Sequence, residues 1–421
     1  MKYKRFFLSI LAVAMALGTG WAVRGKFGHE QGAAWAGAIG ALCLILVAGR
    51  KDWHARAFRI VMAAAFGWGI SGVMSYGMIV GYGRGSDFLN VYYGLLMLFV
   101  LGVLYGFLGG GLFGLALVDS KVNKIRWHSL LAEMIAFGLL AYGVLINQLE
   151  WFMTPPRSEM WAACVGASIA LAWYILRNGH ANVIRVAVWS ALGAGFGFAF
   201  GNFLQVMGNV SGIDFNFWNV MEYSIGFFGG AGMAYGTFTA PWPVADDKPS
   251  PRANVVPILF VALFVPFVVW DQSFVISRFD FIIEAGGSPS SVVLFQWLAI
   301  LAIVLVAARL LYQNSFGEKK HLFETPAAVK EFFILYMALY IFLSFLITGV
   351  FVHPIEQYLY VLNLAVILIL VARTGGGFSS SENKPVMWLT VAVIVVCAIA
   401  IFALIATNSH GEMHGSQVRF K

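Results

Sequence analysis

The segment Trp21–Gly37, WAVRGKFGHEQGAAWAG, places four ionisable side chains between two apolar runs. Arg24, Lys26, His29 and Glu30 lie within seven residues, and glycines separate them. An arginine can hold a carboxylate or phosphate with two hydrogen bonds, a His–Glu pair can relay a proton, and glycine lets the backbone approach a ligand closely. The segment therefore predicts a site for an anion or a sugar, and a charged interfacial loop with an Arg24–Glu30 ion pair is the alternative.

Two polar residues farther along the chain are expected at a similar depth. Glu222 in NVMEYSIG predicts a proton or cation site, or an acceptor for ligand hydroxyls, and an ion pair with Arg24 or Arg84 is the alternative. Asn202 ends a row of glycines and can bond a ligand or a neighbouring helix. The expected substrate-binding residues are Arg24, His29, Glu30, Asn202 and Glu222. No catalytic residue, metal ligand or cofactor is predicted beyond a coupling H⁺ or Na⁺.

Other polar groups have ordinary explanations. Glu133 is expected to extend towards Lys124 or Arg126 near the cytoplasmic end of its helix, and an inner gate or proton exit is the alternative. Three cysteines each fall within an expected helix and form no CxxC motif, which favours packing over a disulfide framework or a metal site.

The remaining motifs are weak. His353 in VFVHPIEQ is expected in a turn, because no further ligands accompany it at metal-binding spacing. His410 and His414 are expected in a frayed tail that can bind a metal weakly at most. GYGRG at Gly81 and GGGLFG at Gly109 resemble phosphate loops in composition, but neither follows a strand.

The elements that position these residues follow from a composition that is 60% hydrophobic and 11% charged, with a mean hydropathy of +0.80. Continuous apolar runs exclude a soluble globular domain and disfavour a transmembrane β-barrel, so the sequence predicts an all-α, polytopic helical membrane protein. About thirteen transmembrane helices are expected, at residues 5–23, 32–49, 58–81, 91–118, 128–149, 160–177, 183–206, 219–239, 254–271, 290–312, 330–351, 356–373 and 386–407.

The distribution of Lys and Arg orients these helices. With the N-terminus in the cytoplasm, the inner segments hold 20 of the 27 basic residues, which fits the positive-inside rule. We therefore expect an inner-membrane protein with a cytoplasmic N-terminus and an external C-terminus. The net charge of +7 is explained by inner loops that face anionic lipid headgroups, and no nucleic acid partner is expected.

Glycine divides the chain into two regions. Of 46 glycines, 37 lie in the first 240 residues, and small residues let transmembrane helices pack closely. We expect a tight, glycine-rich bundle over residues 1–240 and a looser, aliphatic region over residues 254–421. A cytoplasmic linker over residues 241–253 belongs to the stretch APWPVADDKPSPRAN, which carries four prolines.

The glycine-rich half also predicts parallel hairpin repeats. RIVMAAAFGWG from Arg59 matches RVAVWSALGAG from Arg185, and GFLGG at Gly106 matches GFFGG at Gly226. An Ala-Leu-Gly or Ala-Phe-Gly tripeptide near the start of four outward-going helices extends the pattern to the first helix. That helix has the regions of a signal peptide, but we expect it to be retained because cleavage would remove half of a repeat.

A nearly all-membrane chain with short loops and polar groups at one level is typical of a secondary active transporter. The predicted solute is small and polar or anionic, for example a sugar or sugar acid, and its transport is coupled to H⁺ or Na⁺. An intramembrane enzyme that acts on a lipid-linked substrate at the outer leaflet is the alternative, with His29 and Glu30 as base and acid. A non-catalytic membrane scaffold is the third, and the oligomeric state stays open.

Overall fold

The computed structural model describes residues 2–27, 29–245, 250–280, 288–316, 325–349, 354–376, 378–379 and 385–420. For residues 2, 29–31, 316 and 349 it describes the backbone alone. Within these ranges the chain is helical and contains no strand. The all-α prediction is confirmed for this part of the chain.

The first half contains α1 (Lys2–Arg24), α2 (His29–Ala48), α3 (Lys51–Ala55), α4 (Ala57–Ser71), α5 (Gly77–Tyr82), α6 (Phe88–Val118), α7 (Trp127–Tyr142), α8 (Trp161–Arg177), α9 (Ala181–Val210) and α10 (Phe217–Phe238). The second half contains α11 (Pro251–Leu259), α12 (Val265–Ser273), α14 (Pro289–Phe316), α15 (Pro326–Ser344), α17 (Ile355–Arg373) and α18 (Pro385–Ser409). Short π-helical segments extend α7 over Gly143–Gln148, join α11 to α12 over Phe260–Phe264 and extend α15 over Phe345–Gly349.

Nine helices in the described ranges are long and apolar enough to cross a bilayer. Three more apolar helical stretches are shorter, namely Gly32–Ala48, Ala57–Ser71 and Trp161–Arg177. The chain is thus a multi-pass helical membrane protein by composition and length, while the count of about thirteen spans is not confirmed.

Six helices of the first half form a closed ring. In the order α1, α2, α4, α6, α9 and α10, each helix packs against the next, and α10 packs back against α1. Glycines allow the close approach: a Cβ at Gly106 of α6 would collide with the backbone of Ser190 on α9, and one at Gly226 of α10 with the backbone of Leu17 on α1. The ring depends on backbone contacts that larger side chains would prevent.

The two best-matched repeat segments make one equivalent contact. A Cβ at Gly67 of α4 would meet the Leu108 carbonyl oxygen of α6, and a Cβ at Gly193 of α9 would meet the Phe228 carbonyl oxygen of α10. These four residues occupy matching places in the two aligned segments. The contact supports the hairpin repeat, which stays a prediction.

The helix expected over residues 58–81 is interrupted, so that prediction is wrong in its continuity. α4 ends at Ser71 and α5 begins at Gly77, and the residues between them form turns. Gly69, Gly72 and Gly77 surround the break, and each lacks the side chain that favours helix over coil. The interruption places Tyr76 in a non-helical conformation at the inner face of the ring.

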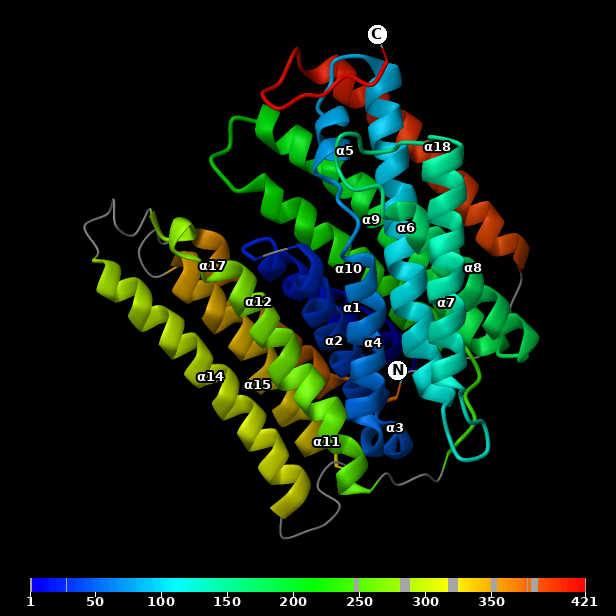
Figure 1. Cartoon of the computed structure of the whole chain (residues 1–421), viewed down its shortest axis with the longest axis vertical. Helices are drawn as coiled ribbons and strands as arrows, with labels where there is room; N and C mark the ends of the chain where they lie inside the picture. Colours follow the sequence, from blue (N-terminus) through cyan, green and yellow to red (C-terminus); the bar gives the residue numbers. More distant parts are fainter. Residues whose placement is uncertain are drawn as a thin grey trace.

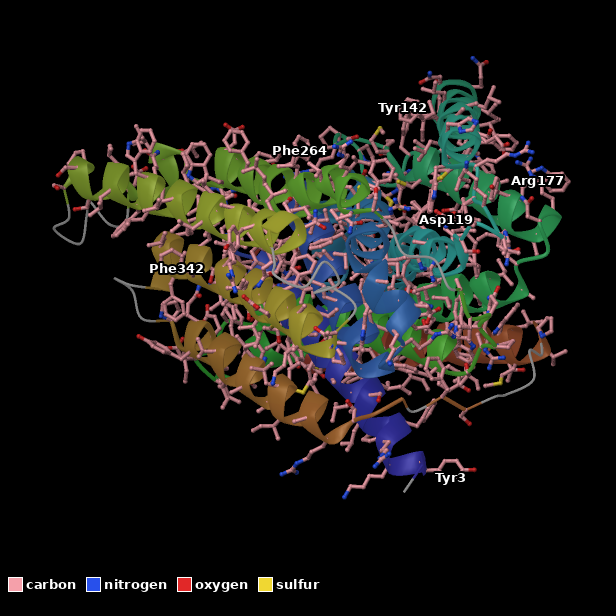
Figure 2. The ribbon with its side chains drawn as sticks, turned by 90° about the horizontal axis from the view of Figure 1, so that it is seen from below. Tyr3, Asp119, Tyr142, Arg177, Phe264 and Phe342 are labelled. Carbon is pink, nitrogen blue, oxygen red and sulfur yellow. The ribbon has the colours of Figure 1, made fainter. Side chains whose placement is uncertain are left out.

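The second half lies against one side of the ring (Figure 1). α11, α12, α15 and α17 contact α4, α2 and α1, while α14 packs on the outside of this group. Phe264 and Phe342 are exposed on the outer surface of this half (Figure 2). α18 differs, because it crosses to the far side of the ring and packs against α6 and α9.

The C-terminal segment is ordered rather than frayed over residues 410–420, which corrects the expectation for this tail. Asn90 at the start of α6 accepts hydrogen bonds from the backbone amides of Arg419 and Phe420 at 2.6 and 2.9 Å and donates to the Phe420 carbonyl oxygen at 3.0 Å. The amide of Gln417 donates to the Gly81 carbonyl oxygen at 3.0 Å. The tail therefore fastens α5 to α6.

Candidate functional site

A buried ion pair joins the end of α1 to α10. Arg24 Nη1 lies 2.9 Å from Glu222 Oε2, and the two side chains are 1% and 0% exposed. The Tyr76 hydroxyl bridges them: it accepts from Arg24 Nη1 at 2.5 Å and donates to Glu222 Oε1 at 2.7 Å. Because Tyr76 lies in the break between α4 and α5, that interruption brings the phenol to the pair.

Two aromatic rings lie against the cation of this pair. The Arg24 guanidinium carbon lies 5.0 Å from the centre of the Trp21 ring and 5.5 Å from that of Tyr76, which places two π-faces on the cation. A buried charge that loses its partner costs about 3–5 kcal/mol, so the two residues depend on each other.

An aromatic cluster of Trp21, Trp68, Tyr105 and Phe198 fills the ring beside the ion pair. The Trp21 ring centroid lies 5.4 Å from that of Trp68 and 5.5 Å from that of Tyr105. Phe198 stacks on Tyr105 at 5.3 Å and meets Tyr76 edge to face at 5.3 Å. The cluster closes the interior of the ring next to Arg24 and Glu222.

Trp68 is the residue of α4 that occupies the interior. Its indole lies where a Cβ would stand at Gly37 of α2 and Gly109 of α6, and a Cβ at Gly229 of α10 would be 3.1 Å from it. The indole N–H groups of Trp21 and Trp68 have no hydrogen-bond partner among the described residues. Two buried donors thus remain unsatisfied beside the ion pair.

The ion pair also lies at the seam between the ring and the second half. Asn219, one turn before Glu222, donates to the Tyr360 hydroxyl of α17 at 2.6 Å. The Tyr340 hydroxyl of α15 donates to the Gly32 carbonyl oxygen at 3.4 Å. Lys26 and Glu356 form a second ion pair across the seam, with 2.7 Å between Nζ and Oε1. Polar contacts from three parts of the chain therefore meet around Arg24 and Glu222.

Of the five expected binding residues, the structure joins two directly. Arg24 and Glu222 form the ion pair that had been the alternative explanation for Glu222. Asn202 is buried, donates to Gln205 Oε1 at 3.2 Å and lies against Gly83 of the α5 end. The side-chain amide oxygen of Asn202 has no hydrogen-bond partner among the described residues. The contacts of Asn202 are with its own helix and α5.

His29 and Glu30 form the first turn of α2, but their side chains lie outside the part of the chain that the structure describes. His353, expected in a turn, also lies outside it. Glu133 pairs with Arg177 of α8 at 2.5 Å and not with Lys124 or Arg126, because α7 and α8 pack side by side.

Sequence reasoning missed the tyrosines. Tyr76 bridges the ion pair, and Tyr340 and Tyr360 border it, yet none of them stands out in a chain with 15 tyrosines. The glycines at 72 and 77 were the available signal for Tyr76, because they indicate a helix break.

No metal centre competes with this site in the described ranges, where no group of three or more His, Cys, Asp or Glu side chains comes together. Fold and site together define a multi-pass helical membrane protein with a buried charge pair at the seam of two helical groups. No family model, curated protein or solved structure matches the chain.

Proposed function

We propose that the protein is a secondary transporter for a small anionic solute, coupled to H⁺, and that Arg24 is the residue that binds the anion. The observation that carries the proposal is the Arg24–Glu222 pair, bridged by Tyr76 from an interrupted helix. Broken helices at the contact of two helical groups are typical of substrate sites in secondary transporters. The ring then provides the path, and the three shorter apolar helices together with α10 complete the thirteen expected spans.

The coupling follows from charge balance. Buried Arg24 needs one anion beside it, and in this conformation Glu222 supplies it. If Glu222 takes up a proton, its negative charge disappears and an anionic solute can replace it beside Arg24. The number of buried charges stays constant in the exchange, so neither step leaves a charge unpaired. A proton and an anion therefore enter together.

The aromatic cluster is the barrier in this conformation. Trp21 contacts both the guanidinium of Arg24 and the rings of Trp68 and Tyr105. A solute that displaces Glu222 from Arg24 therefore disturbs the first residue of the barrier. The unsatisfied indole N–H groups of Trp21 and Trp68 are donors that a polar solute can use on its way through the ring.

The test is thermal melting of purified protein with a panel of sugar acids, carboxylates, inorganic phosphate and neutral sugars. A ligand that binds the folded state stabilises it by about RT ln(1 + [L]/Kd), and the melting temperature rises as a result. We expect an anionic solute to stabilise the wild type more at low pH than at neutral pH. Glu222→Gln, which resembles the protonated acid, should respond at both pH values, and transport into liposomes should lose its dependence on a proton gradient.

Arg24→Met/Glu222→Met removes both charges together and should fold but not respond to the solute. Arg177→Gln/Glu133→Gln removes an ion pair outside the ring and serves as the matched control, with the wild-type response expected. The proposal is wrong if no soluble anion stabilises the wild type or if the Met pair responds as the wild type does. If the response depends on Na⁺ at constant pH, the coupling ion is Na⁺ and not H⁺. If only lipid-linked compounds stabilise the protein, the alternative of an intramembrane enzyme that acts on a lipid-linked substrate is favoured.

A further inference from the structure

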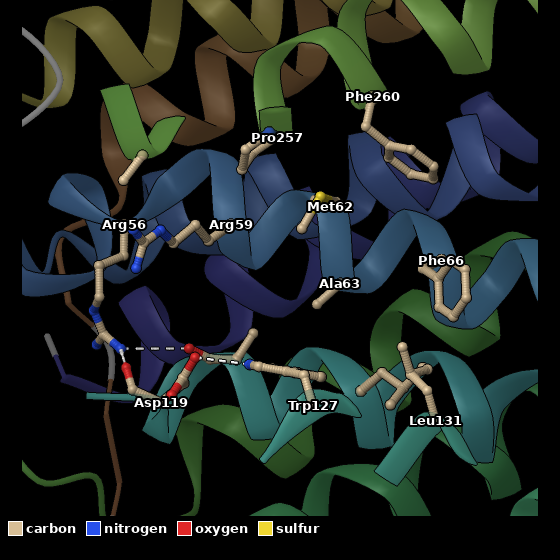
Figure 3. A pocket seen from close by; sticks show the side chains of 13 residues that line it. Arg56, Arg59, Met62, Ala63, Phe66, Asp119, Trp127, Leu131, Pro257 and Phe260 are labelled. Atoms are coloured by element: carbon tan, nitrogen blue, oxygen red, sulfur yellow. Dashed lines mark hydrogen bonds between the residues drawn. The ribbon is translucent and has the colours of Figure 1, made fainter. Parts of the chain in front are cut away.

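A groove lies between α4, α7 and α11 (Figure 3), near the start of α4 and away from Tyr76, which follows the other end of α4. It consists of two adjoining cavities of about 520 and 640 Å³, and Arg56, Arg59, Asp119 and Trp127 line both. The expected topology places this end at the cytoplasmic leaflet. None of these residues belongs to the candidate transport site.

One side of the groove is apolar and long. Met62 and Phe66 of α4 face Leu131 of α7 and Phe260 after α11. Phe66 and Leu131 also line a third cavity of about 390 Å³ between α4, α7 and α8, so the apolar surface continues along α4 to Ile70 and past its end to Val73. From Arg59 to Ile70 the helix rises about 16 Å, close to the roughly 15 Å of one hydrocarbon leaflet.

The other end of the groove is basic. Arg59 borders both cavities, and its guanidinium has no hydrogen-bond or ion-pair partner among the described residues. Lys121 and Lys124 line the second cavity from the loop that follows α6, and both are exposed. The groove therefore joins an apolar slot to an end with an excess of positive charge.

Arg56 and Asp119, which also line this end of the groove, hold the loop after α6 in place. Arg56 donates to the carbonyl oxygens of Leu117 at 3.2 Å and of Asp119, which caps the end of α6. The Asp119 carboxylate accepts from the amide of Ile125 at 3.0 Å and from the Trp127 indole at 2.8 Å. Asp119 thus fixes the loop that carries Lys121 and Lys124.

We propose that the groove binds one anionic phospholipid of the cytoplasmic leaflet, with the phosphate at Arg59, Lys121 and Lys124 and an acyl chain along α4 and α7. The charge of the mouth complements a phosphodiester, and the apolar slot has the length of an acyl chain. The groove borders the bilayer because α7 is mostly exposed, with Ile135 and Leu139 at 64% and 71% exposure. A lipid enters such a groove sideways.

The experiment measures the melting temperature of delipidated protein in a neutral detergent after addition of phosphatidylglycerol or of phosphatidylcholine with the same acyl chains. We expect phosphatidylglycerol to raise the melting temperature by several degrees more than phosphatidylcholine. Arg59→Gln/Lys124→Gln should lose at least half of this difference. Lys51→Gln removes an exposed charge of α3 that lines neither cavity, and it should keep the full difference.

A second variant tests the apolar part. Ala63 lines the slot, so Ala63→Phe should fill it and lower the effect of phosphatidylglycerol while the basic residues stay intact. Glycerol phosphate, the same headgroup without chains, should have little effect. Equal stabilisation by both lipids, an effect of glycerol phosphate as large as that of the lipid, or an equal loss in Lys51→Gln would overturn the proposal.

Discussion

At the scale of single residues, Arg24 and Glu222 are held by each other and by Tyr76, and the three are distant from one another along the chain. Arg24 and Glu222 stand out because charge inside an apolar chain is rare. They are separated by 198 positions, and no local spacing predicts a contact at that distance along the chain. Tyr76 was missed because a tyrosine is common in an apolar helix, and its hydroxyl acquires a role through the helix break alone.

His54 of α3 allows a prediction about pH, since it lies between transmembrane segments. The side chain is buried, its Nε2 donates to the Ile45 carbonyl oxygen at 3.1 Å, and Nδ1 has no hydrogen-bond partner among the described residues. Burial lowers the pKa of His54 below its ordinary value of 6.5 and outweighs the opposing effects of the Ile45 carbonyl and Asp52.

Below about pH 6.5 the unfolded chain therefore binds a proton that folded His54 does not yet bind, so stability is present above this pH and declines as the pH falls. We expect the melting temperature to fall between about pH 7.5 and 5.5, and to fall less in His54→Gln, which keeps a donor for Ile45. His128→Gln removes an exposed histidine and is the control. If the melting temperature falls with pH equally in the wild type and in His54→Gln, this pH dependence does not come from His54.

At the scale of helices, the sequence predicted glycine-mediated packing and was wrong about continuity. Residues 58–81 look like one apolar helix because the only break signals are glycines, and glycines also lie inside other helices of this chain, such as α6. The polar contacts of Tyr76 compensate for the interruption, and these contacts are long-range. A pattern read along one segment cannot include energies that come from α1 and α10.

Gly106 tests the packing of the ring. A Cβ there would meet the backbone of Ser190, which cannot rotate away as a side chain can. Gly106→Ala should therefore cost about 1–3 kcal/mol and lower the melting temperature by several degrees. Gly143→Ala is the matched control, because nothing lies within 4 Å of a Cβ at that helical glycine. A Gly106 variant as stable as the Gly143 variant would show that α6 and α9 are less closely packed.

At the scale of the molecule, the sequence predicts about thirteen transmembrane helices, whereas nine helices in the described ranges are long and apolar enough to cross a membrane. α4 alone, 15 residues long, rises about 22 Å and is too short for a hydrocarbon core of about 30 Å. α4 and α5 together with the break reach farther, from Ala57 to Tyr82. Whether α4 crosses thus depends on an unwound segment that Tyr76 and the tail at α5 stabilise.

Cysteine labelling distinguishes a topology in which α4 crosses the membrane from one in which it does not. In a background without Cys43, Cys164 and Cys397, single cysteines replace exposed residues in successive loops: Lys51, Ser86, Lys124, Ser158, Asn178 and Ser211. If α4 with α5, α6, α7, α8 and α9 all cross, an impermeant maleimide on intact cells labels the variants at 86, 158 and 211, and the others require permeabilised cells. If α4 does not cross, the variants at 51 and 86 label on the same side. In that case the ring is not transmembrane throughout, and a path along its axis cannot connect the two sides of the membrane.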